Sequence, residues 1–121
     1  MKRIFIIAAL AMLLAGCASS LSGDYAKGGK GKTMLVSQTV WGSYQEYLTK
    51  ISGVYKGLFV VALYNGVAES SYYYYCPGAS CYTANYAKKA MDGCRSLGGN
   101  PECVLFANSG DIQVNYKLLD N

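Results

Sequence analysis

The pattern of apolar and polar positions predicts a folded domain that begins at Met34. Residues 34–41 are β-branched and apolar enough for a strand or an extended lead-in, and Gly42 follows as a break. From Tyr44 to Ile51 apolar residues recur at intervals of three and four, with polar residues between them. This spacing predicts a short helix over 44–51 with one face in the core.

A central hairpin is the clearest prediction along the chain. Residues 57–64 form a near-continuous apolar run, suited to a strand in the middle of a sheet that is covered on both faces. Asn65 and Gly66 follow at once and tolerate the positive φ angles of a type I′ turn. The return strand is predicted over 67–75. Strand alternation would place Tyr73 and Tyr75 on one face of the sheet, and Tyr72 and Tyr74 on the other.

The C-terminal part predicts a second helix and two more strands. Small residues recur at helical spacing from Tyr82 or Thr83 to about Leu97, and the two glycines and the proline that follow would end the helix. Strands are predicted over 103–107 and 112–116, with a turn between them. The predicted class is α+β, a small and mostly antiparallel sheet packed against one or two helices.

The first residues have the organisation of a secretion signal. Residues 1–16 begin with Lys2 and Arg3, continue with an apolar run too short to span a bilayer comfortably, and end in small residues. The quartet Leu14-Ala15-Gly16-Cys17 resembles the lipobox of bacterial lipoproteins. The resemblance implies cleavage before Cys17 and acylation of its sulfur and amine. An ordinary signal peptide near a cysteine is the alternative.

The lipobox resemblance also implies a location. In lipoproteins an acidic residue after the cysteine tends to retain the protein in the inner membrane, and here that residue is Ala18. The expected location is the outer membrane, with the domain facing the periplasm, or the cell membrane of an organism without an outer one. Residues 17–33, rich in Ser, Gly and Lys, predict a lipid-anchored flexible tether, and 34–121 predict a single domain. The lysines of the tether would either contact anionic lipid or simply remain in solvent and keep the spacer extended. The solvated spacer is the favoured interpretation.

Composition excludes several function classes. The 121 residues fit one domain, and the chain contains no histidine, which removes the commonest general base and metal ligand. Loss of residues 1–16 leaves nine basic residues against seven acidic ones, too little positive charge for a nucleic-acid reader. Residues 26–33 match a loose phosphate-binding loop, but neither the buried strand nor the helix that such a loop needs is predicted beside them. We therefore expect neither nucleic acid nor nucleotide as a partner.

The cysteines predict disulfides. With Cys17 assigned to lipid, Cys76, Cys81, Cys94 and Cys103 remain, an even number in an oxidising compartment. Of the three connectivities, Cys76–Cys81 and Cys94–Cys103 are preferred, because the first pair closes a Pro-Gly turn and the second ties a helix end to the next strand. A four-thiolate zinc site and a redox-active pair are weaker alternatives, since the spacings are not Cys-x-x-Cys. No metal and no cofactor are expected.

The C-terminal half also resembles a small cysteine-paired domain of unknown function from bacterial envelope and secreted proteins. The resemblance begins at Gly57. It is carried by the strand that ends in Asn65-Gly66, the Tyr75-Cys76-Pro77 run with Cys81, the helix from Ala87 to Cys94, and 103–107 leading into 112–114. It implies no activity.

The expected function is non-catalytic: a membrane-anchored envelope lipoprotein that acts as a protein-interaction module. The alternative is a glycan or peptidoglycan-binding module that uses Tyr72 and Tyr74, whose rings would stack on sugars if they are exposed. Packing of the same two rings beneath a helix is the competing structural explanation. An enzyme with a carboxylate pair drawn from Asp92, Glu102 and Asp111 is the least favoured reading, because the domain is small and each residue suits a solvated surface.

Overall fold

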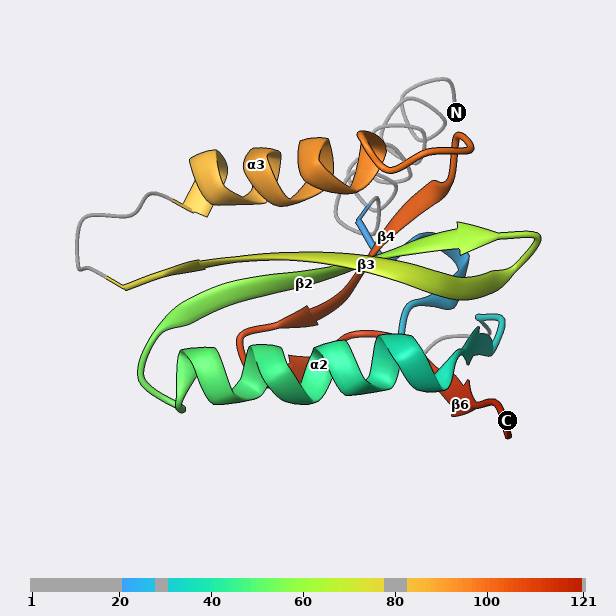
Figure 1. The fold of residues 1–121 in the computed structure, drawn as a ribbon, viewed down its shortest axis with the longest axis horizontal. Helices are drawn as coiled ribbons and strands as arrows, with labels where there is room; N and C mark the ends of the chain where they lie inside the picture. Colours follow the sequence, from blue (N-terminus) through green and yellow to red (C-terminus); the bar gives the residue numbers. More distant parts are fainter. Residues whose placement is uncertain (1–20, 28–30, 78–82, 121) are drawn as a thin grey trace, which may run out of the picture.

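The fold has three layers, with a sheet between two helices (Figure 1). The computed structural model describes residues 21–27, 31–77 and 83–120. In these ranges helix α2 (Gln38–Ile51) covers one face of the sheet and α3 (Thr83–Arg95) covers the other. The predicted α+β class is therefore confirmed.

The sheet is mixed. Over the described residues its strand order is β5-β4-β2-β3-β1-β6. The elements besides the two helices are the 3₁₀ helix η1 (Gly23–Tyr25) and the strands β1 (Met34–Val36), β2 (Lys56–Tyr64), β3 (Val67–Cys76), β4 (Glu102–Asn108), β5 (Asp111–Ile112) and β6 (Tyr116–Leu118). The pairs β2–β3, β2–β4 and β4–β5 are antiparallel, whereas β1 pairs in parallel with both β3 and β6.

The sheet is mostly antiparallel, as predicted, but it also contains two parallel pairings that were not predicted. The two longest pairings, β2–β3 and β2–β4, are antiparallel as predicted. The chain reverses once between β1 and β2, after α2, and again in the hairpin before β3, so β1 and β3 point the same way. The amino-acid composition of a strand does not show how often the chain changes direction before the neighbouring strand, so it does not predict whether the two pair in parallel.

The central hairpin forms as predicted. Asn65 has φ 54° and Gly66 has φ 83°, the left-handed pair that a type I′ turn needs. Strand β2 is buried along almost its whole length, because α2 covers one of its faces and α3 covers the other. Alternation along β3 directs Tyr73 and Tyr75 toward α2, and Tyr74 toward α3.

Helix α2 begins six residues earlier than the predicted 44–51, at Gln38. The cause is Ser37, whose side-chain oxygen accepts a hydrogen bond from the Val40 amide at 3.2 Å. The buried face then runs through Val40, Tyr44, Tyr47 and Ile51, the spacing of one helical stripe. The predicted strand over 34–41 is therefore correct only for its first three residues.

The predicted last strand, 112–116, is split between two edges of the sheet. Ile112 belongs to β5 and Tyr116 to β6, at opposite ends of the strand order. The four steps between them span at most roughly 14 Å, so the two edges approach each other. Both side chains pack against the cluster under α2, and the sheet therefore curls toward that helix.

The core consists of two clusters, one on each face of the sheet. The cluster under α2 is rich in aromatic rings, and Phe59 lies at its centre with ring centroids 5.3 Å from Tyr44, 5.4 Å from Tyr47 and 5.9 Å from Phe106. The cluster under α3 is smaller, and its helical members include Ala90 and Cys94, both fully buried. Small residues let α3 lie close to the sheet, as predicted.

Residues 21–27, which we call the N-terminal strap, lie against the domain. The Leu105 amide donates to the Leu21 carbonyl at 2.8 Å, and the Asn115 amide donates to the Tyr25 carbonyl at 2.9 Å. The Tyr25 side chain is buried in the cluster under α2. This placement differs from the flexible tether that composition predicts for the same residues. Backbone groups make most of these contacts, and composition does not report them.

Candidate functional site

The two tyrosines predicted as a binding platform face α3. The Tyr74 ring is half-buried and stacks on Tyr86 with centroids 6.4 Å apart. The Lys89 ammonium lies 5.2 Å from the centre of the same ring. Tyr74 is thus packed beneath the helix, which is the structural alternative considered for it.

Tyr72 is partly covered by the backbone of the same helix. A Cβ atom placed on Gly93 would lie 2.3 Å from Cε1 of Tyr72. The Tyr72 ring therefore packs directly against the α3 backbone at Gly93, which has no side chain. Tyr72 remains 37% exposed. Of the two predicted platform residues, Tyr72 is the more exposed.

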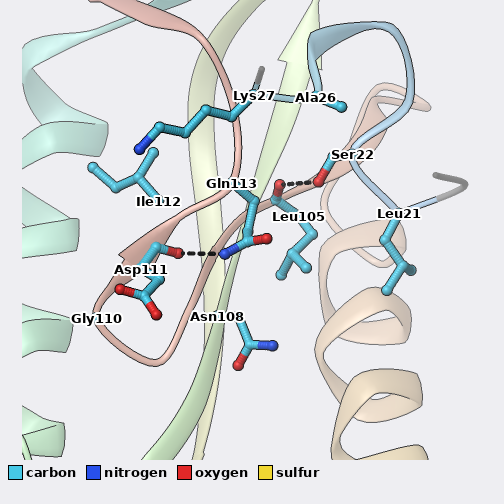
Figure 2. A pocket seen from close by; sticks show the side chains of 10 residues that line it. All are labelled: Leu21, Ser22, Ala26, Lys27, Leu105, Asn108, Gly110, Asp111, Ile112 and Gln113. Carbon is cyan, nitrogen blue, oxygen red and sulfur yellow. Dashed lines mark hydrogen bonds between the residues drawn. The ribbon is translucent and has the colours of Figure 1, made fainter. Parts of the chain in front are cut away.

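A groove of about 980 Å³ lies between the N-terminal strap and the β4–β5 hairpin (Figure 2). Its walls are held by two hydrogen bonds: Ser22 Oγ donates to the Leu105 carbonyl at 3.2 Å, and Gln113 Nε2 donates to the Asp111 carbonyl at 3.0 Å. The residues that line it are Leu21, Ser22, Ala26, Lys27, Leu105, Asn108, Gly110, Asp111, Ile112 and Gln113.

The groove has the chemistry of a binding surface. The charged residues among its described lining are Lys27 and Asp111, both exposed to solvent. The Ile112 side chain lies beside them, and the Leu21 side chain lies at the opposite end of the groove (Figure 2). Sequence analysis missed this site, because it treated the strap as a tether and the β4–β5 turn as a connection.

The candidate acidic residues lie at different places on the surface of the domain. Glu102 begins β4, whereas Asp111 pairs with Asn108 at the other end of that strand. Six residue steps along the strand separate these ends, a distance of about 20 Å. Asp92 lies on the surface of α3, where a hydrogen bond from Lys88 at 2.7 Å lowers the pKa of its carboxyl. Glu102 and Asp111 are therefore too far apart for a glycosidase pair.

One of the two predicted disulfides is present in the described part of the chain. Cys94, at the end of α3, is bonded to Cys103 in β4. This bond ties the helix to the sheet, as the sequence predicts, and leaves these two thiols unable to ligate zinc. Cys17 and Cys81 lie outside the described residues, so acylation of Cys17 and the Cys76–Cys81 pairing stay predictions. No cluster of metal-ligating side chains occurs within residues 21–27, 31–77 and 83–120.

Two tyrosine hydroxyls under α2, those of Tyr47 and Tyr73, donate hydrogen bonds. Tyr47 donates to the Ser109 carbonyl at 2.7 Å, and burial raises the pKa of its phenol well above the ordinary value. Burial also raises the pKa of Tyr44 and of Tyr73, which donates to Glu46 at 3.3 Å. A raised phenol pKa opposes formation of a nucleophilic phenolate, so these groups serve packing and hydrogen bonding.

An apolar turn between α2 and β2, residues 52–55, is a second surface that sequence analysis missed. Val54 is 77% exposed and Tyr55 is 39% exposed, and the Tyr55 ring lies 6.3 Å from that of Tyr75. The turn is fixed, because the amides of Val54 and Tyr55 both donate to the Ile51 carbonyl at 2.9 Å. Periodicity could not find this surface, since it assigns apolar residues to the interior by default.

Comparisons with known proteins found no match. Neither models of protein families, nor curated proteins, nor solved structures match the chain. The resemblance to lipoproteins and to an envelope domain therefore stays a prediction. Among the helices in the described part of the chain, none is long and apolar enough to cross a membrane.

Proposed function

We propose that this chain is a non-catalytic envelope lipoprotein whose domain binds another envelope protein. The anchor would be diacylglycerol and an acyl chain on Cys17, which the Leu14-Ala15-Gly16-Cys17 motif supports. Ala18 after the cysteine supports the outer membrane as its location, or the cell membrane where no outer membrane exists. The Cys94–Cys103 disulfide agrees with an oxidising compartment.

The apolar turn is the observation that carries the interaction role. Covering exposed apolar side chains with a partner is energetically favourable, so such side chains often mark an interaction site. Val54 and Tyr55 are among the most exposed apolar residues that the structure describes. The hydrogen bonds to Ile51 hold the turn in one shape before a partner arrives, which lowers the entropy lost on binding. Exposed Lys50 and Lys56 flank the turn in the sequence. The matching partner surface is an apolar pocket with an acidic rim.

Site-specific photocrosslinking in cells tests this interaction. A photoreactive amino acid at position 54 should give one adduct of defined mass, and the same amino acid at Lys88, exposed on α3, should not. Tyr55→Ala should reduce the yield at position 54 while leaving expression unchanged. Equal, diffuse labelling from positions 54 and 88 would refute the interaction surface.

The anchor needs its own test. Radiolabelled palmitate should enter the wild-type chain and should be absent from Cys17→Ser. Incorporation that persists in the variant, or that never occurs in the wild type, would refute acylation at this residue.

Glycan binding remains the alternative, and the exposed edge of Tyr72 supports it. The Tyr74 ring is packed under α3, so any sugar contact would depend on Tyr72. Sedimentation with purified peptidoglycan should be lost in Tyr72→Ala if this alternative is correct. Unchanged sedimentation of the variant, or no sedimentation of the wild type, would exclude it.

A further inference from the structure

We propose that the groove beside the N-terminal strap is the face of the domain that lies against the lipid leaflet. The inference rests on the proposed acylation of Cys17. It concerns how the domain is oriented on the membrane and which face is left for a protein partner.

The first argument is the length of chain between the anchor and the domain. Leu21 is fixed to the sheet by the hydrogen bond from the Leu105 amide. Only four residue steps separate Cys17 from Leu21, and they span at most about 14 Å. A free tether over 17–33 would reach roughly 20 Å on average and further when extended. Docking of the strap therefore keeps the Leu21 end of the domain close to the acylated cysteine.

The second argument is that Leu21 itself forms part of the groove. Its side chain is 41% exposed at one end of the lining, and Ile112 contributes a second apolar side chain (Figure 2). The anchor thus brings this groove, rather than the apolar turn between α2 and β2, to the leaflet first. Exposed apolar groups at this place are covered when the interface between headgroups and acyl chains lies against them.

The charges of the groove fit the headgroup region. Lys27 offers an ammonium group to lipid phosphates, and its apolar stem lies along the groove toward Ile112. Asp111 is the other charged residue of the described lining and would accept hydrogen bonds from the ammonium of a phosphatidylethanolamine. One cation and one carboxylate match a zwitterionic lipid, which carries the complementary pair.

Lysine acetylation of the anchored protein tests the orientation. The acylated full chain is reconstituted in vesicles of phosphatidylethanolamine and phosphatidylglycerol, treated with a water-soluble acetylating ester, and analysed by mass spectrometry. Acetylation of Lys27 should be slower than in a Cys17→Ser chain that lacks residues 1–16 by about fivefold, which corresponds to the ~1 kcal/mol typical of a lysine held at a charged leaflet. Lys88, exposed on α3, should react equally in both.

A longer tether provides the matched control. A flexible Gly-Ser segment inserted between Ser20 and Leu21 leaves the strap and the cysteine intact but removes the limit on reach. The chain should still float with vesicles, while Lys27 becomes as reactive as in the truncated Cys17→Ser chain. Equal protection with and without the insertion would overturn the argument from reach.

The remaining outcomes separate the two proposals. A chain that carries acyl groups and floats, but whose Lys27 reacts at the same rate as in the truncated Cys17→Ser chain, overturns the orientation and leaves the anchor standing. A chain that carries no acyl groups refutes the anchor and, with it, the orientation.

Discussion

Replacement of Gly93 by alanine tests the contact between α3 and Tyr72. A Cβ atom at this position would lie 2.3 Å from Cε1 and 2.4 Å from Cζ of Tyr72, so the ring must move away. Gly42, inside α2, is the matched control, because a Cβ there meets nothing within 4 Å. Both substitutions put alanine into a helix, and only one of them meets a neighbour.

The two variants should change the free energy of unfolding in opposite directions. Gly42→Ala should stabilise the protein by about 1 kcal/mol, the difference in helix propensity between the two residues. Gly93→Ala has the same gain, but displacement of the ring exposes on the order of 100 Å² of apolar surface, which costs about 2.5 kcal/mol. The net effect is a loss of stability of roughly 1 to 2 kcal/mol.

Urea unfolding of Cys17→Ser chains that lack residues 1–16, with the Cys94–Cys103 disulfide intact, measures both effects. In a Tyr72→Ala background no ring remains to be displaced, so Gly93→Ala should stabilise by about 1 kcal/mol, as Gly42→Ala does. Stabilisation by Gly93→Ala of the same size in both backgrounds would show that the ring does not rest on the helix, and would refute the reasoning.

Three further predictions concern the core, the disulfide and alkaline pH. Tyr47→Phe removes the hydrogen bond to Ser109 and should lower the free energy of unfolding by about 1 kcal/mol in urea titrations; no change would mean that water replaces the bond. Replacement of Cys94 and Cys103 by serine opens a short loop and should cost about 2 to 3 kcal/mol, measured as a lower urea midpoint than that of the oxidised chain. Burial raises the pKa of Tyr44 and Tyr47, so the folded state holds their protons more tightly than the unfolded state. Stability from these groups is complete below about pH 10 and is lost as the pH rises further; urea midpoints at pH 8 and 11 should differ less in Tyr47→Phe.

Much of the fold was predictable because its signals are local. The hairpin at Asn65 and Gly66, the alternation of tyrosines along β3 and the small residues of α3 each follow from a few neighbouring positions. The Cys94–Cys103 bond was predictable for the same reason, since a helix end and the next strand must lie close together.

The errors arose where a capping residue or a distant neighbour decides the structure, and hydrophobic alternation reports neither. Alternation alone does not show that Ser37 caps a helix in the middle of a β-branched run. Nor does it show that Ile112 and Tyr116 pair with different strands at opposite edges. The candidate surfaces were missed for a related reason: the groove needs the strap beside β4, and the apolar turn breaks the rule that apolar residues point inward.

The N-terminal strap accounts for how one edge of this sheet is protected. β4 contains a buried apolar run from Val104 to Ala107, but β5 covers only its last residues, Ala107 and Asn108. Elsewhere along β4, the Leu21 carbonyl accepts a hydrogen bond from the Leu105 amide, as a partner strand would. An uncovered apolar edge of this kind would pair with another chain. The segment that composition marks as a spacer therefore both completes the fold and, in the proposed lipoprotein, determines how far the domain stands from its anchor.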